Sequence, residues 1–308
     1  MKAAPTRMAP IVAPIRKHLF IYLLVLPGFV YTLVFHYIPI YGITIAFKDF
    51  RMSKGIIGSP WVGFDHFRAL LQDDYFYKVL WNTVILNLYG LVFGFTFIIF
   101  LALMMNEIKI GLLKRLFQTF VYLPHFISWV VFAGLIGILL SPSEGPINLI
   151  VSWFGHEKIY FLTNNEWFRT VLVTSGIVKT AGFGTIIYLA SMAGINPELY
   201  ESAMVDGAHR LRMMWHITLP RIRPTIAVML ILQVAGLFNS NFEQVYNLYN
   251  PLVMDSGDVL STYLYRTGLL ESSFEAATAL GLIFSLIGLL LIIVTNQIVK
   301  KMDVTGIF

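Results

Sequence analysis

The sequence contains no cysteine, which excludes disulfide bonds, thiolate catalysis and cysteine-ligated metals. Charge is also scarce: only 13% of the 308 residues are Asp, Glu, Lys or Arg, whereas soluble domains carry about 25%. Hydrophobic residues make up 57% of the chain, and the mean hydropathy is +0.73. The scarcity of charge therefore excludes an ordinary soluble domain and predicts a membrane protein.

Two signatures of chemistry are also missing. The chain has no G-x-x-x-x-G-K-[ST] phosphate loop, so we do not expect it to bind ATP in that way. It has no H-E-x-x-H pair, and His36 and His125 lie in different apolar stretches without an acidic residue nearby in the sequence. Packed, hydrogen-bonded histidines are the simpler interpretation. We therefore expect neither an enzyme nor a chain with its own metal or cofactor.

Long apolar stretches are what the sequence does contain. A helix needs roughly 20 apolar residues to cross a bilayer. Because lipid cannot hydrogen-bond the backbone, such a stretch should be helical. We therefore predict an all-α polytopic membrane protein with six transmembrane helices in one domain, residues 19–299. The expected spans are residues 19–47, 79–105, 116–140, 170–193, 224–241 and 276–299.

The placement of charge predicts the orientation of the chain. Six spans put the N-terminal segment, residues 1–18, and the tail, residues 300–308, on one side of the membrane. The apolar run from Leu19 to Phe47 is too long for the core of a signal peptide, so we expect an uncleaved span. Basic loops stay in the cytoplasm, so both termini should be cytoplasmic. The basic residues on that side are Lys2, Arg7, Arg16, Lys17, Lys109, Lys114, Arg115, Arg210, Arg212, Arg221, Arg223, Lys300 and Lys301.

Residues 194–223 form a charged insert between the fourth and fifth spans. Asn196 and Pro197 suit the start of a helix, Gly207 suits a left-handed turn, and Pro220 interrupts the second helix. A helix-turn-helix on the cytoplasmic surface is therefore expected. Physics alone leaves two interpretations open, an interfacial hairpin that connects two spans or a helix that docks in the groove of a partner.

The spacing within this insert resembles the EAA loop of ATP-binding-cassette (ABC) import permeases. That signature reads E-A-A, three residues, G, nine residues, I-x-L-P, and the sequence departs from it only at Ser202, where the family usually has Ala. Serine is also small, so docking becomes the favoured interpretation. The resemblance implies that the insert couples to an ATPase through Glu201, Ser202, Ala203, Asp206, Gly207, Ile217, Leu219 and Pro220.

The resemblance extends along nearly the whole chain. The stretch "SPWVGFDHF" at 59–67 and the pair Asn82-Thr83 look like permeases of the maltose-permease type. The stretches "FEQVYNLYNP" at 242–251 and "STYLYRTGL" at 261–269 look like the subgroup that imports oligosaccharides derived from polysaccharides, such as alginate or pectin fragments.

This resemblance implies a division of labour among several proteins. The fold would be that of an ABC type I importer in a bacterial inner membrane. The expected partners are a second permease of similar fold, two ABC ATPase subunits that bind ATP and Mg, and an extracytoplasmic solute-binding protein that delivers an oligosaccharide. The alternative is a secondary transporter that works alone on an ion gradient, but the interiors of the expected spans hold no acidic residue.

Lys179, near the middle of the fourth span, and four polar residues in or just beyond the outer part of the fifth are candidates for the substrate pathway; these four are Gln233, Asn239, Asn241 and Glu243. A lysine at the centre of a span costs about 2.5–3.5 kcal/mol on insertion scales, so Lys179 should face the protein interior or water. It either pairs with a backbone carbonyl or an acid, or snorkels, or it lines the pathway and favours an acidic sugar. The four other residues suit either helix–helix hydrogen bonds or contacts with a sugar.

Overall fold

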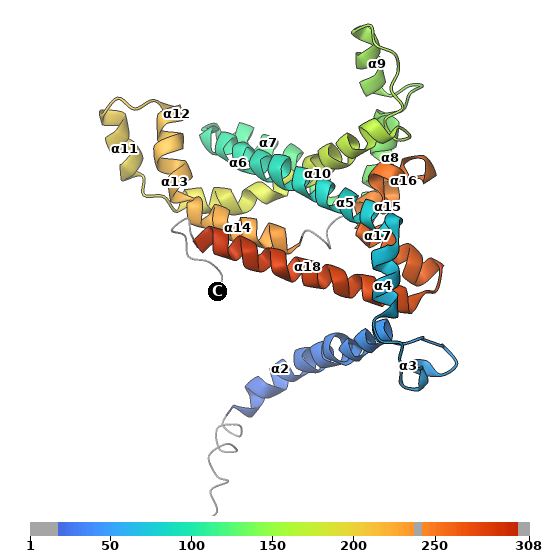
Figure 1. The fold of residues 1–308 in the computed structure, drawn as a ribbon. Helices are drawn as coiled ribbons and strands as arrows, with labels where there is room; N and C mark the ends of the chain where they lie inside the picture. Colours follow the sequence, from blue (N-terminus) through green and yellow to red (C-terminus); the bar gives the residue numbers. More distant parts are fainter. Residues whose placement is uncertain (1–17, 237–241, 301–308) are drawn as a thin grey trace, which may run out of the picture.

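The computed structural model describes residues 18–236 and 242–300 (Figure 1). Within these residues every regular element is a helix, and the only β-pairing is an isolated bridge between Lys48 and Trp61. Four helices are long and apolar enough to cross a membrane, or up to six if each of two bent pairs is one span. The prediction of an all-α polytopic protein is thus confirmed.

The first span is an arm that stands apart from the other helices (Figure 1). It consists of α2 (Leu19–Thr32), a π-helical turn η1 (Leu33–Tyr37) and a 3-10 helix η2 (Ile38–Phe47). Its most apolar stretch buries no residue within the described chain. The end in η2 packs on the body, where Ala46 is fully buried beside Leu280.

The second span is continuous, whereas the third is broken. After α3 (Gly55–Gly58) and α4 (Asp65–Gln72), the second span runs through α5 (Asp74–Tyr89), η3 (Gly90–Phe95) and α6 (Thr96–Glu107). The third expected span departs from a single helix, because α7 (Gly111–Phe126) and α8 (Trp129–Leu139) meet at 108°. Pro124 stands in the last turn of α7, and Ser128 caps α8 by accepting a hydrogen bond from the Val131 amide at 3.4 Å. A short helix, α9 (Pro146–Trp153), follows.

The long helix α10 (Asn165–Ala193) is the centre of the bundle and packs on α6 and α7. Two glycines allow this close packing. A Cβ atom at Gly182 would lie 2.0 Å from the carbonyl oxygen of Val121 in α7, and one at Gly184 would lie 3.0 Å from Ile98 in α6. The small residues around Lys179 therefore serve helix–helix contact.

At one end of α10 the chain forms an elbow, residues 196–222 (Figure 1). Its helices are α11 (Glu198–Val205), α12 (Arg210–Met213), the π-helical turn η4 (Met214–Thr218) and α13 (Leu219–Arg221). The following helix, α14 (Arg223–Ala235), leaves the elbow at 61°. The outer part of the expected fifth span, with Asn239 and Asn241, lies outside the described residues.

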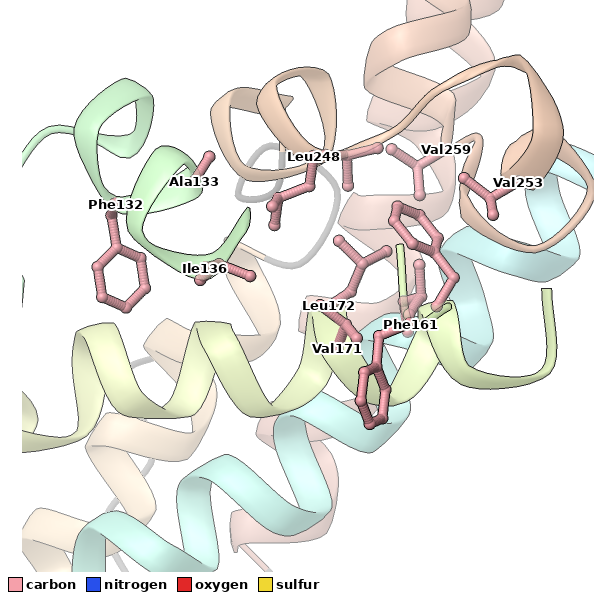
Figure 2. Close-up of a cluster of buried hydrophobic side chains, with 12 residues drawn as sticks. Phe132, Ala133, Ile136, Phe161, Val171, Leu172, Leu248, Val253 and Val259 are labelled. Atoms are coloured by element: carbon pink, nitrogen blue, oxygen red, sulfur yellow. The ribbon is translucent and has the colours of Figure 1, made fainter. Parts of the chain in front are cut away.

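The opposite end of α10 carries a rim, residues 251–271, which follows α15 (Phe242–Leu248). The rim contains η5 (Pro251–Val253), α16 (Met254–Gly257), α17 (Leu260–Tyr265) and the π-helical turn η6 (Arg266–Leu270), and it leads into the last span, α18 (Phe274–Lys300). Figure 2 shows the apolar core of this end, in which Phe132 and Ile136 of α8, Leu172 of α10, Leu248 of α15 and Val253 of the rim are clustered.

Candidate functional site

A hollow of about 190 Å³ with a few polar groups opens beside α10, between α5, η3, α14 and α15. Its walls offer amides, a hydroxyl and one indole among aliphatic side chains and glycines, which are groups that can hydrogen-bond and stack on a small polar ligand. None of the described residues that line it is charged. The lining residues are Leu86, Asn87, Gly90, Leu91, Gly94, Ile98, Trp129, Leu172, Val173, Gly176, Ile177, Thr180, Gln233, Gln244 and Val245.

The candidate pathway residues do not all lie at the hollow. Gln233 lines the hollow, whereas Lys179 and Glu243 do not. Gln244, next to Glu243, also lines it and is fixed there because its amide donates to the Leu172 carbonyl and to the Ser175 hydroxyl. Sequence reasoning missed Gln244 and Trp129. The polar and aromatic composition of 233–249 pointed to the first, but nothing near Trp129 in the sequence pointed to the second.

Lys179 lies at the break between α7 and α8. Its ammonium donates hydrogen bonds to the carbonyl oxygens of Pro124 at 3.2 Å, His125 at 3.4 Å, and Ile127. The side chain is buried, with 7% of the residue exposed. The sequence left several interpretations of Lys179 open, and these contacts agree with the one in which it pairs with backbone carbonyls.

The rim is held by a buried ion pair. Asp258 is completely buried, and one of its oxygens accepts from Arg266 at 2.7 Å and from the Tyr75 hydroxyl, while the other accepts from Thr262 at 2.7 Å. A buried carboxylate is tolerated only when such partners replace water. Tyr263 adds a further link, donating to Asp73 at 3.2 Å.

Burial and neighbouring groups shift the pKa values of Arg266 and Tyr263 in this network. Burial lowers the pKa of Arg266, but the hydrogen bond and charge of Asp258 outweigh it, so the net shift is upward. Burial, with smaller contributions from Asp73, raises the pKa of Tyr263 to about 12. Arg266 therefore stays charged and Tyr263 stays a donor at neutral pH.

Two helices from elsewhere in the chain clamp the rim. Asn82 of α5 donates to the carbonyl oxygens of Asp255 at 3.0 Å and Asp258 at 3.2 Å, and its own oxygen accepts from Arg169 of α10 at 2.8 Å. Thr83 accepts the amide of Leu260 at 2.9 Å. The rim is therefore fastened to the helices that also wall the hollow.

The elbow has the helix-turn-helix geometry expected from its sequence. The Asn196 side chain accepts the Glu198 amide at 3.1 Å and so caps α11. Gly207 has φ of +77°, in the left-handed region that favours glycine. A hydrogen bond of 2.9 Å between the hydroxyls of Tyr200 and Thr218 joins the two halves of the elbow.

One face of the elbow is exposed and the other is anchored. Among the residues expected to couple, Glu201, Ser202, Asp206 and Gly207 are exposed, and Ala203, Ile217, Leu219 and Pro220 are partly buried. Large apolar side chains accompany the exposed set, namely Met204, Val205, Leu211 and Trp215. On the anchored face, Met214 and fully buried Ile222 pack with Tyr188 of α10 and Ala102 of α6.

Helices of membrane-spanning length, a hollow beside α10 and a partly exposed helical elbow at one end are the features expected of a membrane transport subunit. The similarity of the sequence to known proteins then identifies its family. The chain belongs to the binding-protein-dependent transport system inner membrane components, whose family profile matches residues 94–304.

Individual relatives agree along nearly the whole chain. The polygalacturonan/rhamnogalacturonan transport system permease protein YteP of Bacillus subtilis (strain 168) is 43% identical over 94% of this chain and 90% of its own. A bacterial ABC transporter involved in the import of the acidic polysaccharide alginate has a chain with a TM-score of 0.88 and 42% identity, covering 94% of this chain and 98% of that one.

A second structure of a bacterial alginate ABC transporter, in complex with an alginate pentasaccharide-bound periplasmic protein, gives a TM-score of 0.89 at 41% identity, over 96% of this chain and 99% of that one. These similarities confirm the expected family, the ABC type I importer fold and the permease class. They also set aside a transporter that works alone, because the family depends on a binding protein.

Proposed function

We propose that this chain is one of two permease subunits of an ATP-driven importer for acidic oligosaccharides, delivered by an extracytoplasmic solute-binding protein. The observation that carries the proposal is the similarity, over nine-tenths of the chain, to permeases of systems for polygalacturonan and for alginate. Both names describe polymers of acidic sugars, and this chain covers nearly all of each relative. The substrate class is therefore a fragment of a uronic polysaccharide.

The elbow is the point at which partner ATPase subunits would act. Its exposed acids and apolar side chains suit a groove that takes both polar and apolar contacts. Glu201 is a polar anchor in this proposal, and Gly207 sets the angle between the two elbow helices. ATP and Mg²⁺ are bound by the ATPases, and this chain supplies the lever that moves with them.

The basic loops support a cytoplasmic location for the elbow and for both termini. The arm supports a second permease, because its most apolar stretch buries no residue within the described chain. Its side chains are exposed, for example 73% at Phe20 in α2 and 42% at Leu33 in η1. In this proposal another membrane protein covers the arm, and the translocation pathway runs between the two subunits.

The hollow is the part of the pathway that this chain contributes. Gln233 and Gln244 give it amide groups, and Trp129 gives it an aromatic face. Sugars use both kinds of contact. Asn239, Asn241 and Glu243 all lie between Gln233 and Gln244 in the sequence. We assign them to the same pathway.

The test is the ATPase activity of the complete complex reconstituted in lipid. The binding protein would be loaded in turn with uronic oligosaccharides and with neutral oligosaccharides of the same length. We expect uronic oligosaccharides to stimulate ATP hydrolysis and to enter the vesicles, and neutral ones to do neither. Equal stimulation by both sets would overturn the acidic substrate class, and no import of any oligosaccharide would overturn the function itself.

A further inference from the structure

We propose that Lys179 is a positioning residue, which holds the break between α7 and α8 and thereby fixes Trp129 as a wall of the hollow. Lys179 itself does not line the hollow, whereas Trp129 does. The role of that wall in import rests on the proposed function, but the positioning of Trp129 by Lys179 does not.

The break creates a need that Lys179 meets. The last carbonyl groups of a helix have no partner within it, and an unsatisfied backbone group costs several kcal/mol in lipid. A lysine ammonium has three donors. The three acceptors are the carbonyl oxygens of Pro124 and His125, in the last turn of α7, and of Ile127, the first residue after it. The Pro124 carbonyl also accepts the Ile127 amide at 3.3 Å, so the ammonium supplements the backbone hydrogen bonds at the bend.

The same ammonium also faces two rings of α8. Its nitrogen lies 5.1 Å from the ring centroid of Trp129 and 5.5 Å from that of Phe132, within the range of a cation–π interaction. The two rings pack edge to face with their centroids 5.7 Å apart. Lys179 therefore joins the end of α7 to the first residue of α8 and restricts the Trp129 indole without itself lining the hollow.

The position of Lys179 is built into the packing of α10. Gly182, three residues further along the helix, brings α10 so close to α7 that a Cβ atom there would meet the Val121 carbonyl at 2.0 Å. The His125 ring stacks on Phe183 with centroids 4.1 Å apart, next to the same bend. These contacts hold the ammonium within reach of the carbonyls.

Lys48 offers a matched control in the same chain. It is also buried, donates to the carbonyl oxygens of Ile56 at 2.6 Å and Ile57 at 3.3 Å, and lies 5.0 Å from the ring centroid of Trp61. Trp61 does not line the hollow. Loss of Lys48 therefore removes a similar set of contacts without disturbing that wall.

The first experiment measures acrylamide quenching of tryptophan fluorescence in the complex purified with its partner subunits. The signal of Trp129 is isolated as the difference between chains with and without Trp129→Phe, in the wild-type and the Lys179→Met backgrounds. We expect Lys179→Met to increase the quenching of Trp129, and Lys48→Met to leave it unchanged. Unchanged quenching of Trp129 in an assembled Lys179→Met complex would overturn the proposal.

If Lys179→Met does not assemble, Lys179→Arg provides the test, because it keeps the charge and the donors but spreads them over a planar group. An assembled Lys179→Arg complex should show a partial increase in Trp129 quenching, and wild-type quenching would contradict the proposal. This readout needs no substrate, so it stands or falls separately from the proposed function.

The second experiment measures import by the reconstituted complex. We expect Lys179→Met and Trp129→Leu each to raise KM about tenfold, equivalent to about 1.4 kcal/mol, and the double variant to be no worse than either alone, because both changes remove the same wall. Lys48→Met should keep the wild-type KM. Effects of Lys179→Met and Trp129→Leu that simply add would show that the two residues act independently and would overturn the proposal.

Discussion

The rim and the elbow lie at opposite ends of α10 and satisfy their polar groups in opposite ways (Figure 1). In the rim, Asp258 is completely buried and has partners from α5, α17 and η6. In the elbow, Glu201 and Asp206 are exposed, and Val205 beside them is 88% exposed. Asp258 thus finds its partners within this chain, although Nη1 of Arg266 and the Thr267 hydroxyl are buried without a hydrogen-bond partner among the described residues. The elbow instead presents acids and apolar side chains that the described residues do not cover.

The difference shows how one helical bundle can have a rim that stabilises it and an elbow that is open to a partner. The rim ties α5 to α10 through Asn82 and Arg169 and so stabilises the helices around the hollow. The elbow is attached to the same bundle on its buried face, through Ile222, while its exposed face is available to a partner. If the elbow acts as we propose, a force applied to it reaches α14 and α10 through these buried contacts and not through the rim.

The largest effect on stability is expected from Asp258→Asn in the rim. The change leaves the Arg266 charge partly buried without its partner, and breaking a buried pair in this way costs about 3–5 kcal/mol. Thermal unfolding of the purified complex should show a large drop in Tm or a loss of assembled protein. The matched control is Asp255→Asn, since the Lys78–Asp255 pair is exposed and should contribute only about 0–1 kcal/mol. Equal losses in the two variants would contradict the account of the rim.

A smaller effect is expected from Gly207→Ala in the elbow. Its φ of +77° costs an L-residue roughly 1–2 kcal/mol, so the turn should shift and ATPase stimulation should fall while most of the complex remains assembled. Gly194→Ala is the control, because its φ is −84° and a Cβ atom there meets no close atom. The measurement is binding-protein-stimulated ATP hydrolysis, and equal activity of both variants would argue against a special role for the turn.

The loss of thermal stability at alkaline pH is expected to depend on Tyr263 in the rim. Its folded-state pKa of about 12 lies above the ordinary value of about 10. Its stabilising contribution is therefore present below about pH 10 and is lost as the pH rises towards 12. Tyr263→Phe should flatten the fall of Tm over that range, and Tyr160→Phe, at an exposed position, should not. Identical pH profiles for wild type and Tyr263→Phe would refute this assignment.

The smallest effect on stability is expected from Glu201→Gln. The side chain is exposed, so the Tm should stay within experimental scatter of wild type. Import should nevertheless fall, since the carboxylate is proposed to contact the ATPase. Glu198→Gln in the same helical turn is the control. A drop in Tm without a change in import would reverse the roles we assign to rim and elbow.

The sequence predicted the features that local residues determine. Apolar length predicted the helices, and the arm covers the same residues, Leu19–Phe47, that the sequence marked. Gly207 and Asn196 predicted the turn and the cap of the elbow, because left-handed backbone and helix caps depend on one or two neighbouring residues.

The break in the third span could have been predicted from the sequence, but the apolar composition of the stretch outweighed the signals for a break. Pro124 and Ser128 are a helix interruption and a helix cap four residues apart, yet the apolar run of 116–140 favoured one continuous helix. The position of Lys179 could not be predicted, since its three carbonyl partners lie more than 50 residues away in the chain. The same holds for Tyr75 and Asp258, which are 183 residues apart.

The docking of the elbow on an ATPase is tested most directly by site-specific cross-linking. The chain has no cysteine, so Ser202→Cys gives it a single thiol, which is labelled with a maleimide photo-cross-linker on this chain before the complex is assembled; Glu271→Cys does the same at the rim. The account predicts an ATPase adduct from position 202 and none from position 271. Adducts from neither position, or from position 271 alone, would contradict it.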